Sequence, residues 1–516
     1  MPCANASKIK DLDELAGLVR GLKAEGKKVV MSHGVFDLLH MGHIRHLEQA
    51  RQMGDVLVVT LTQDRYVNKG PDRPAFPEDL RAEALAALSA VDFVAVNRWP
   101  QATETIRLLQ PNIYVKGQDY RIAEQDITGG ISVEAEAVQS VGGEIRFTDD
   151  ITFSSSTLLN KFFSPFPPET DEYLQSFRKR HSSDEVLSWL DRAAQVRPLV
   201  VGEAIIDEYL FCDGIGKSSK DPVLAVLQKR VESYVGGSLA VANHLAGLCP
   251  EVALVTQLGD ADRSEDWVRR ELHPNVSPLF VTKSGSPTLR KRRVLEAYSG
   301  SKLLEIYLMN DQPTEGADEQ KLQAALLKTI DVDQHDLVLV ADYGHGMLSP
   351  RAIATLCGMA AFLALNVQSN AGNRGFNPIS KYSRADYICL NSHEVEVETR
   401  RHMNGDVQKT KAAMMEIAAR TNCHRFTVTR GKFGSLHYDV HTGFHEAPAL
   451  ATRVLDRVGS GDGVLALTSL LVQMGAPWDI VAFLGNVAGA EMVAQLGNRT
   501  TIDKVAMSKH VVTLLK

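Results

Sequence analysis

The residues whose types and spacing first suggest chemistry lie at 32–43, where His40 and His43 stand close to Gly34 and Gly42. An apolar run at 29–31 predicts a strand before this segment, and apolar residues at helical spacing over 44–53 predict a helix after it. The glycines let the backbone approach a ligand, and the N–H groups at a helix N-terminus attract phosphate. The two imidazoles can donate hydrogen bonds to the α-phosphate and the departing pyrophosphate of a nucleoside triphosphate.

The histidines of this segment allow two other interpretations. His33, His40, His43 and His46 could gather a metal ion, because His43 and His46 lie one helical turn apart. However, no cysteine or carboxylate with metal-ligand spacing stands beside them to complete a shell. They could also be histidines of a turn that bind nothing. The residues alone leave these alternatives open.

Three later loops at predicted strand ends carry groups that can bind phosphate. Arg73 and Arg81 offer guanidinium groups, and Lys116 offers an ammonium group on a turn after the apolar residues 113–115. The sequence Ser-Ser-Ser-Thr at 154–157 opens a predicted helix over 158–162 and is typical of an N-cap. Each feature also has an ordinary structural explanation, as an exposed loop or a helix cap.

The strongest chemical pattern of the second half is Asp-Arg-Val-Gly-Ser-Gly-Asp-Gly at 456–463, which precedes an apolar helix predicted over 464–474. Gly459 and Gly461, with Ser460 between them, expose N–H groups at the helix start and predict an anion hole for a transferred phosphoryl group. Asp462, one step into the helix, can take the proton from an acceptor hydroxyl.

Two other predicted strand ends carry polar groups. Asp342 ends the buried strand 337–342 before a glycine-rich loop and is a candidate sugar contact. Asn391 and Glu394 follow another strand, where an amide and a carboxylate suit a hydrated Mg²⁺ ion and a triphosphate, so that Glu394 is the candidate magnesium residue. The segment 214–218 resembles a P-loop only in part, because position 211 is Phe instead of the first glycine.

Length and composition limit the class of protein. A chain of 516 residues predicts about two to four domains. A charged fraction of 23% and a net charge of −7 argue against nucleic acid or an anionic membrane as the main partner. The six cysteines show no regular spacing, which argues against disulfides and zinc and favours a reducing cytoplasm. We expect no leader and no membrane span, because no apolar run approaches about 18 residues.

The order of predicted elements indicates two α/β domains. Strands and helices alternate over 1–163, which predicts a Rossmann-like parallel sheet with ligands at the carboxyl ends of its strands. Residues 164–195 are proline-rich and then charged, and predict a linker followed by a helix over 186–194. Residues 196–516 predict a second α/β domain, in which the short β-prone runs of 205–235 form a small sheet used as a lid over a sugar.

The motifs of the first domain resemble those of the cytidylyltransferase-like nucleotidyltransferases, because Gly34-x-Phe36-Asp37 is followed by His40-x-Gly-His43. The short motifs at 69–70, 73–74, 81, 115–120, 142–144 and 155–157 follow the order and spacing of the nucleotidyltransferase half of the bifunctional heptose-phosphate kinase/heptose-1-phosphate nucleotidyltransferases.

This resemblance implies that the first domain transfers a nucleotidyl group from ATP to heptose 1-phosphate. The alternative is CTP with another phosphorylated polyol. His40, His43 and Lys116 are then the candidate catalytic side chains. The resemblance implies nucleotide contacts by Gly34, Phe36, Asp37, Arg81, Ser155, Ser156 and Thr157.

The second domain resembles the ribokinase-like sugar kinases over 197–512. The resemblance implies that Asp462 is the catalytic base, that Asn391 and Glu394 serve ATP and Mg²⁺, and that the domain forms a homodimer through its lid. In the typical heptose enzyme the kinase comes first, whereas here it comes second. The alternative is a catalytically silent module retained for binding or dimerisation.

The expected sugar site departs from the heptose kinases at two places. Gly236 and Gly237 are kept, but the asparagine that follows in the family is Ala240 here, and Asp-Pro-Lys of a later strand end is Asn-Val-Gln at 366–368. Asn243, the polar loop 370–374 and the basic run 290–293 could compensate. We therefore expect weak or no activity on heptose 7-phosphate.

Overall fold

The computed structural model describes residues 5–67, 70, 73–118, 130–148, 164–330 and 334–516. The chain divides into two compact units, which are described separately: residues 1–165 with 508–516, and residues 166–507.

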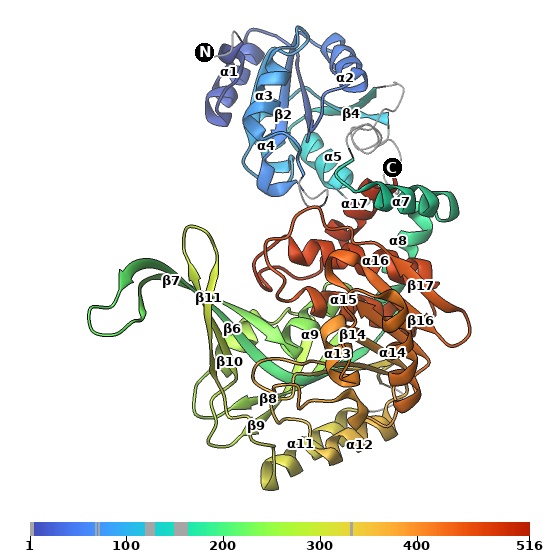
Figure 1. Ribbon diagram of the computed structural model, residues 1–516. Helices are drawn as coiled ribbons and strands as arrows, with labels where there is room; N and C mark the ends of the chain where they lie inside the picture. The colour runs from blue at the N-terminus through green and yellow to red at the C-terminus, as the bar shows by residue number, and fades with distance from the viewer. Residues whose placement is uncertain (1–4, 68–69, 71–72, 119–129, 149–163, 331–333) are drawn as a thin grey trace. The chain divides into compact units, whose positions relative to one another are not determined.

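The first unit is built on a fully parallel five-stranded sheet with the order β3-β2-β1-β4-β5, which confirms the Rossmann-like prediction (Figure 1). Its elements are α1 (Leu12–Ala24), β1 (Val29–Gly34), α2 (Met41–Gln52), β2 (Val56–Thr62), α3 (Glu78–Ala86), β3 (Phe93–Asn97), α4 (Thr103–Leu109), β4 (Ile113–Gly117), α5 (Gly130–Ser140) and β5 (Glu144–Thr148). The strand order reverses between β1 and β4, and ligands of such sheets bind at the carboxyl ends of these strands.

Two apolar cores hold this sheet. Every residue of β2 is buried, as expected of a parallel strand covered on both faces. One core contains buried residues of α1, α4 and α5, and the other contains buried residues of α2 and α3. The helices therefore lie on both faces and leave the carboxyl edge of the sheet to loops.

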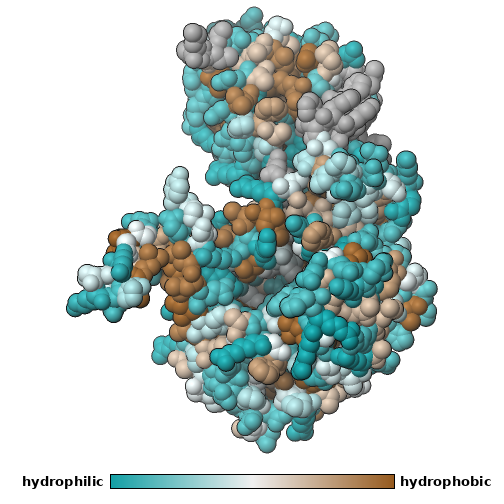
Figure 2. All heavy atoms as spheres, viewed as in Figure 1, coloured by the Kyte–Doolittle hydropathy of each residue, from teal (hydrophilic) through white to brown (hydrophobic). Residues whose placement is uncertain are grey.

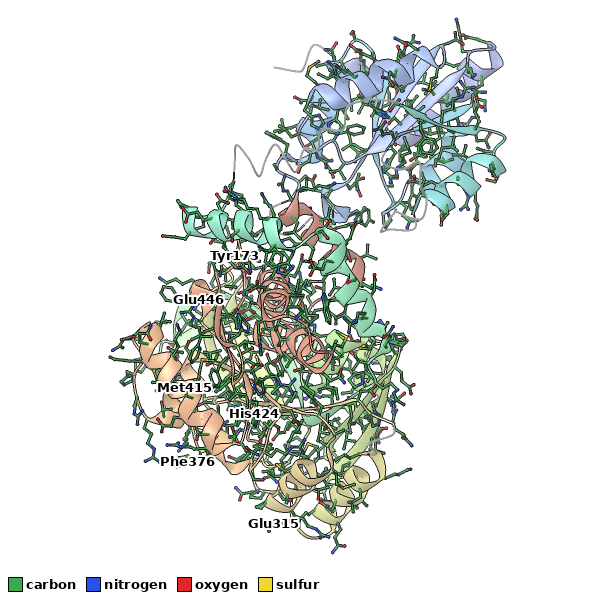
Figure 3. The ribbon with its side chains drawn as sticks, turned by 90° about the vertical axis from the view of Figure 1, so that its right-hand side faces the viewer. Tyr173, Glu315, Phe376, Met415, His424 and Glu446 are labelled. Atoms are coloured by element: carbon green, nitrogen blue, oxygen red, sulfur yellow. The ribbon has the colours of Figure 1, made fainter. Side chains whose placement is uncertain are left out.

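The second unit begins with two helices that pack on its body, α7 (Pro168–Arg180) and α8 (Ser183–Arg192). Phe177 of α7 is fully buried and stacks on Phe483 with the ring centroids 4.3 Å apart. Figure 3 marks α7 by the label of Tyr173. The sequence predicted a linker and one helix for residues 164–195, whereas the structure has two helices there, α7 and α8.

A long mixed sheet forms the centre of the second unit, in the order β9-β8-β6-β12-β13-β14-β15-β16-β17. The strands from β9 to β15 in this order run parallel, β16 is antiparallel to β15, and β17 is antiparallel to β16. The strands are β6 (Pro198–Lys217), β7 (Leu224–Gly237), β8 (Val252–Gly259), β9 (Val276–Lys283), β10 (Arg290–Glu296), β11 (Lys302–Leu308), β12 (Leu337–Asp342), β13 (Leu363–Val367), β14 (Tyr387–Asn391), β15 (Arg425–Thr429), β16 (Ser435–Asp439) and β17 (Gly443–Ala447).

Helices cover both faces of this sheet (Figure 1). The helices are α9 (Ser238–Ala246), α10 (Glu265–Glu271), α11 (Gly316–Thr329), α12 (Pro350–Met359), α13 (Ser392–Thr399), α14 (Val407–Arg420), α15 (Ser460–Gln473) and α16 (Trp478–Val493). A last helix, α17 (Lys504–Leu515), begins at the end of this unit, and its residues from 508 on belong to the first unit. Beyond the main sheet, β6 continues into a lid in which it pairs with β7 and β10, and β10 pairs with β11. The predicted α/β domain with a small β lid is confirmed.

Candidate active sites

In the first unit, His40 caps the helix that follows β1. Its Nδ1 accepts a hydrogen bond from the N–H of Gly42 at 3.1 Å, so the proton of the neutral ring is on Nε2. This Nε2 is buried and has no hydrogen-bond partner among the described residues, and burial lowers the pKa of His40. The helix N-terminus therefore presents a neutral N–H donor.

The structure brings the second candidate histidine to the same place. The rings of His40 and His43 are stacked with centroids 4.0 Å apart, and Phe36 meets His43 edge-on at 5.3 Å. Phe36 has a φ of 52° and its ring lies against the Cα of Gly34, where a Cβ would come within 3.2 Å of it. Gly34 and Phe36 therefore shape the turn that holds the histidine pair.

Asp37 and Arg81 hold the loops around this turn. Asp37 is buried and accepts hydrogen bonds from Arg73 at 3.1 Å and from the N–H of Ala75 at 2.5 Å. Arg81 is only 2% exposed. Its guanidinium donates to the carbonyl oxygens of Val35, Thr62 and Phe76 and to the carboxylate of Asp64. Both residues have protein partners, so nucleotide contact by them stays a prediction.

Lys116 ends β4, the neighbour of β1. Its Nζ lies 2.9 Å from the carboxylate of Glu134 on α5, which also accepts a hydrogen bond from Tyr114. Burial, and then the charge of Lys116, lower the pKa of His33 to about 3. The lysine therefore lies beside β1 at the edge where the strand order reverses.

The structure does not favour a metal site at the histidines. Both ring nitrogens of His33 face threonine hydroxyls, and both of His46 face hydroxyls of Ser32 and Thr148. Within the described ranges, no three His, Cys, Asp or Glu side chains are grouped so that they could hold a metal ion. Ser155, Ser156 and Thr157 lie outside the described residues.

In the second unit, the glycine turn before α15 has the geometry of a candidate anion site. Gly459 is the N-cap residue with a φ of 82°, and a Cβ there would lie 1.9 Å from Oδ1 of Asn498, so only glycine fits. Ser460 donates from its hydroxyl to the carbonyl of Arg457 at 2.9 Å and closes the turn. The first N–H groups of the helix have no intrahelical acceptor, which makes this turn suitable for an anion.

Asp462 lies on the first turn of α15 and is held by Tyr343, whose hydroxyl donates to it at 2.7 Å. The pKa of Asp462 is raised to about 7, chiefly by burial and also by the negative charge of Asp207. The hydrogen bond from Tyr343 and the positive charge of Lys291 act in the opposite direction. A carboxylate with a pKa near neutrality is suited to accept a proton at the pH of most cells.

Asp207 is a candidate site residue that the sequence did not single out, and its charge acts on Asp462. It lies on β6, is buried, and forms an ion pair of 2.5 Å with Arg293 of β10. Gly236 leaves room for it, since a Cβ at that position would lie 2.2 Å from its carboxylate. The pair of carboxylates at 207–208, directly after the apolar residues 204–206, was the available signal.

Asp456, the first residue of the glycine motif, connects this turn to the lid. Its carboxylate accepts from Lys302 of β11 at 2.5 Å, from the Tyr209 hydroxyl of β6 at 2.9 Å and from the N–H of Val458 at 3.2 Å. The lid strands and the turn that precedes Asp462 therefore share one buried carboxylate.

Three expected sugar contacts differ in their surroundings. Gly237 has a φ of 60° and starts α9 beside β6. Asp342 is 1% exposed and its carboxylate is taken up by Tyr382 at 2.6 Å and Lys381 at 2.6 Å. The amide of Asn243 bonds to the backbone of residues 271 and 273. The structure gives Asp342 and Asn243 scaffolding roles, and sugar contact by them stays a prediction.

Asn391 and Glu394 form a capping box at the start of α13. Glu394 is buried and accepts from the N–H of Asn391 at 2.7 Å. Burial raises the pKa of Glu394 to about 8, the N–H of Asn391 opposes the shift, and the charge of Asp462 adds to it. This electrostatic influence places Glu394 in the neighbourhood of Asp462.

Comparison with protein families agrees with this architecture. Residues 31–162 match the cytidylyltransferase-like family, and residues 197–505, more than half of the chain, match the pfkB family of carbohydrate kinases. The chain belongs to the pfkB carbohydrate kinase family and carries a cytidylyltransferase-like domain ahead of the kinase domain. Its two domains are those of a nucleotidyltransferase and of a carbohydrate kinase.

Individual relatives match one part of the chain at a time. The bifunctional protein HldE of Geotalea uraniireducens is 42% identical over 153 residues, 29% of this chain and 30% of that protein. HldE of Geobacter sulfurreducens is 37% identical over 166 residues, 32% of each. Both matches concern the N-terminal part, and the chain therefore spans about a third of these relatives' length.

A solved structure supports the fold of the second unit. Phosphofructokinase-2 of Escherichia coli in complex with potassium is covered over 100% of its length and matches 62% of this chain, with a TM-score of 0.50 and 16% identity. Among the described helices, none has the length and apolar character needed to cross a membrane.

Proposed function

We propose that residues 1–163 transfer a nucleotidyl group from ATP or CTP to a sugar 1-phosphate. The observation that carries this proposal is the neutral Nε2–H donor of His40 at the start of α2, stacked on His43. Heptose 1-phosphate is the acceptor implied by the resemblance to the heptose enzymes, and another phosphorylated polyol with CTP is the alternative.

In the proposed reaction, an acceptor phosphate oxygen bonds to the α-phosphorus while the α–β bridging P–O bond breaks and pyrophosphate leaves. The attacking oxygen is already anionic, so no general base is required. His40 and His43 donate hydrogen bonds to the charge that develops, and the helix N-terminus and Lys116 add positive potential.

Pyrophosphate release tests this site, measured with ATP and CTP against a panel of sugar 1-phosphates and polyol phosphates. His43→Ala is expected to lower the rate by about 10²–10³-fold. His40→Asn keeps a helix-capping side chain but removes the imidazole donor, and should lose a similar factor. Arg20→Ala, on the exposed side of α1, is the control. A His43→Ala variant with full activity would refute the assignment.

For the second domain we propose transfer of the γ-phosphoryl group of ATP to a sugar hydroxyl. Asp462, with its pKa near 7, supports this role as the base that accepts the hydroxyl proton. The N–H groups after Gly459 would bind the phosphoryl group. ATP-dependent phosphorylation that is abolished in Asp462→Asn and kept in the exposed His402→Ala control tests this.

Magnesium fits this proposal. Glu394, close enough to Asp462 to feel its charge, is the residue that we assign to the ion, and a nearby divalent cation favours the ionised form of a buried carboxyl. When bound with ATP, Mg²⁺ neutralises part of the triphosphate charge.

The acceptor is proposed to differ from heptose 7-phosphate, because Ala240 and residues 366–368 depart from the heptose kinases. Of the three polar-loop residues that were expected to compensate, Asn370, Asn373 and Arg374, the first two have scaffolding contacts, because their amides donate to the carbonyl of Tyr343. Turnover of heptose 7-phosphate at about 1 to 10³ per second would show this proposal to be wrong.

The second candidate function of this unit is association through its lid. Exposed apolar side chains line the lid strands, and Figure 2 shows them as a brown area there. They include Ile215, Leu224, Leu227, Leu304 and Ile306. We propose a homodimer, with Leu304→Glu expected to give a monomer by native mass measurement. No nucleic-acid or membrane partner is proposed, and a cytoplasmic location stays a prediction.

A further inference from the structure

The helix α5 of the first unit carries a carboxylate on its buried side. Ile131, Ala137 and Val138 are buried at helical spacing. Glu134 lies in the same row and is only 7% exposed, whereas Glu136, two residues later, is exposed. A buried carboxylate is costly unless it is paired, so an apolar side chain would serve packing better at position 134. The presence of Glu134 there needs a reason other than packing.

Two side chains of β4 meet this carboxylate. Tyr114 and Lys116 lie two residues apart on the strand, so they point to the same face of the sheet. The Oε2 atom of Glu134 lies 2.9 Å from Nζ of Lys116 and accepts a hydrogen bond from the Tyr114 hydroxyl at 3.1 Å. Lys116 is 9% exposed and Tyr114 is fully buried. An ammonium group and a phenol therefore share one carboxylate oxygen.

The two donors differ in their freedom to move. Tyr114 belongs to the same apolar core as Met31 and Ala137, which fixes its ring and its hydroxyl. Burial raises the pKa of Tyr114 above its ordinary value, so the phenol stays protonated and remains a donor. Lys116 is the next-to-last residue of β4, at the carboxyl edge of the sheet, and has a flexible four-carbon stem. The ammonium group can therefore leave Glu134 while the phenol stays.

The ion pair compensates the charge of Lys116 at the edge where the proposed nucleotidyl transfer needs it. In a buried ion pair, the attraction between the charges roughly offsets the cost of taking them out of water. A nucleoside triphosphate carries several negative charges and attracts an ammonium group more strongly than one carboxylate does. These conditions favour an ion pair that opens when a triphosphate binds.

We infer that Glu134 is the counter-ion that a bound triphosphate replaces. Lys116 exchanges the carboxylate of Glu134 for a phosphate oxygen, and the Tyr114 hydroxyl keeps its hydrogen bond to Glu134 after the exchange. This inference rests on the proposed nucleotidyl transfer. Glu134 and Tyr114 are positioning residues, since they act on the reaction only through Lys116.

The exchange sets how tightly the site holds its anions. Glu134 competes with the phosphate oxygen for Lys116 before the reaction and after it, so it weakens the binding of the triphosphate and of pyrophosphate alike. Lys116 is on the phosphate both in the bound substrate and in the transition state, so the competition leaves the chemical step unchanged. When pyrophosphate leaves, the carboxylate takes its place at Lys116.

Kinetics of pyrophosphate release on the full chain test the exchange. Glu134→Gln keeps the shape of the side chain but removes its charge. It should lower KM for the nucleoside triphosphate by about tenfold, because a hydrogen bond between charged groups is roughly twice as strong as one to a neutral group. The inhibition constant of pyrophosphate should fall by a similar factor, and the single-turnover rate should not change. Glu136→Gln, on the exposed side of α5, is the matched control.

Tyr114→Phe should have the opposite effect on KM. Without the hydroxyl, Glu134 loses the donor that remains when Lys116 leaves, so KM for the triphosphate should rise by about three- to tenfold. When Tyr114→Phe is combined with Glu134→Gln, this rise should disappear, because the charge on which the hydroxyl acts is absent. A merely structural role of the cluster would move KM in the same direction in both single variants.

Two kinetic results would overturn the inference. A raised KM in Glu134→Gln would mean that Glu134 orients Lys116 toward the phosphate and does not compete with it. An unchanged KM would mean that the ion pair does not open when the triphosphate binds. Glu134→Asp keeps the charge but lengthens the ion pair, so it should lower KM by less than Glu134→Gln does. This variant covers the case of a Glu134→Gln protein that does not fold.

Binding of pyrophosphate separates this inference from the proposed function. Titration calorimetry on the full chain measures the pyrophosphate binding that is lost in Lys116→Gln. Tighter binding in Glu134→Gln, without pyrophosphate release from any triphosphate and acceptor, would support the counter-ion and refute the nucleotidyl transfer. Pyrophosphate release by the wild type, with equal or weaker binding in Glu134→Gln, would support the transfer and refute the counter-ion.

Discussion

Replacing Tyr343 with phenylalanine removes one hydroxyl, which donates a 2.7 Å hydrogen bond to Asp462. This bond favours the ionised carboxylate, so its loss raises the pKa of Asp462 above the present value of about 7. A hydrogen bond to a charged group contributes about 1.5–3 kcal/mol, and 1.36 kcal/mol corresponds to one pKa unit. Because Asp462 is partly exposed and water replaces some of the bond, we expect a rise of about one unit.

The consequence is a change in the pH profile of the kinase reaction. A base must be ionised to accept a proton, so activity falls as the pH drops through its pKa. A rise of about one unit lowers the ionised fraction at a pH of about 6.5 roughly eightfold and at a pH of about 9 by less than twofold. The assay is ADP formation against pH for the wild type and Tyr343→Phe, at saturating ATP and acceptor.

Two results would refute this reasoning. A profile that keeps its acid limb, with activity lowered equally at every pH, would mean that Tyr343 acts on structure and not through the protonation of Asp462. A wild-type profile without an acid limb near neutrality would mean that Asp462 is not the base. Tyr307→Phe, which removes a hydroxyl bonded to Glu305, is the matched control and should leave the limb in place.

Three further changes have outcomes that follow from the contacts described above. As the pH rises from the ordinary pKa of a glutamate to about 8, the wild-type protein should lose about 1.4 kcal/mol of stability per pH unit, because its folded state binds the proton of Glu394 more tightly than its unfolded state does. Glu394→Gln should abolish this loss, which is measured by denaturant unfolding at several pH values. Phe177→Ala should destabilise the second unit by about 3–4 kcal/mol, seen as a lower Tm of its transition. Lys302→Met removes a partner of Asp456 and should lower kcat/KM of the kinase without affecting pyrophosphate release.

Each of these has its own control. Gln at position 394 can still complete a capping box, so an equal pH slope in both proteins would contradict the assigned titration. Tyr173→Ala, on the same helix as Phe177, should cost less, because Phe177 alone stacks on Phe483. Lys302→Arg keeps the charge, and a loss equal to that of Lys302→Met would argue against the ion pair as the cause.

The general architecture could be predicted because alternating elements and buried strands leave a direct trace in the sequence. The position of Asp462 could be predicted for a similar reason, since glycines followed by an apolar helix specify a helix N-terminus. The start of α2 was harder to place. Its cap is His40, whereas the residues that usually mark a helix start are Ser, Thr, Asp and Asn.

Contacts between distant parts of the chain could not be predicted. The carboxylate of Asp342 ends a strand, as expected, but its partners Lys381 and Tyr382 come about forty residues later and only the fold brings them together. The helix α7 was hidden by prolines and charges, although Leu174 and Phe177 lie one turn apart and are both buried. Tertiary burial decided the conformation of this segment against its composition.

The strand β6 has a consequence for how the second unit opens. Residues 199–203 pair with β8 and β12 of the main sheet, and residues 206–217 pair with β7 and β10 of the lid, without a loop between them. A lid joined in this way cannot swing on a hinge and can move only as one strand twists or bends. In native-state hydrogen exchange, the amides near Ile206 should therefore exchange together with those of the main sheet, as one cooperative unit, while the hairpin tip opens first.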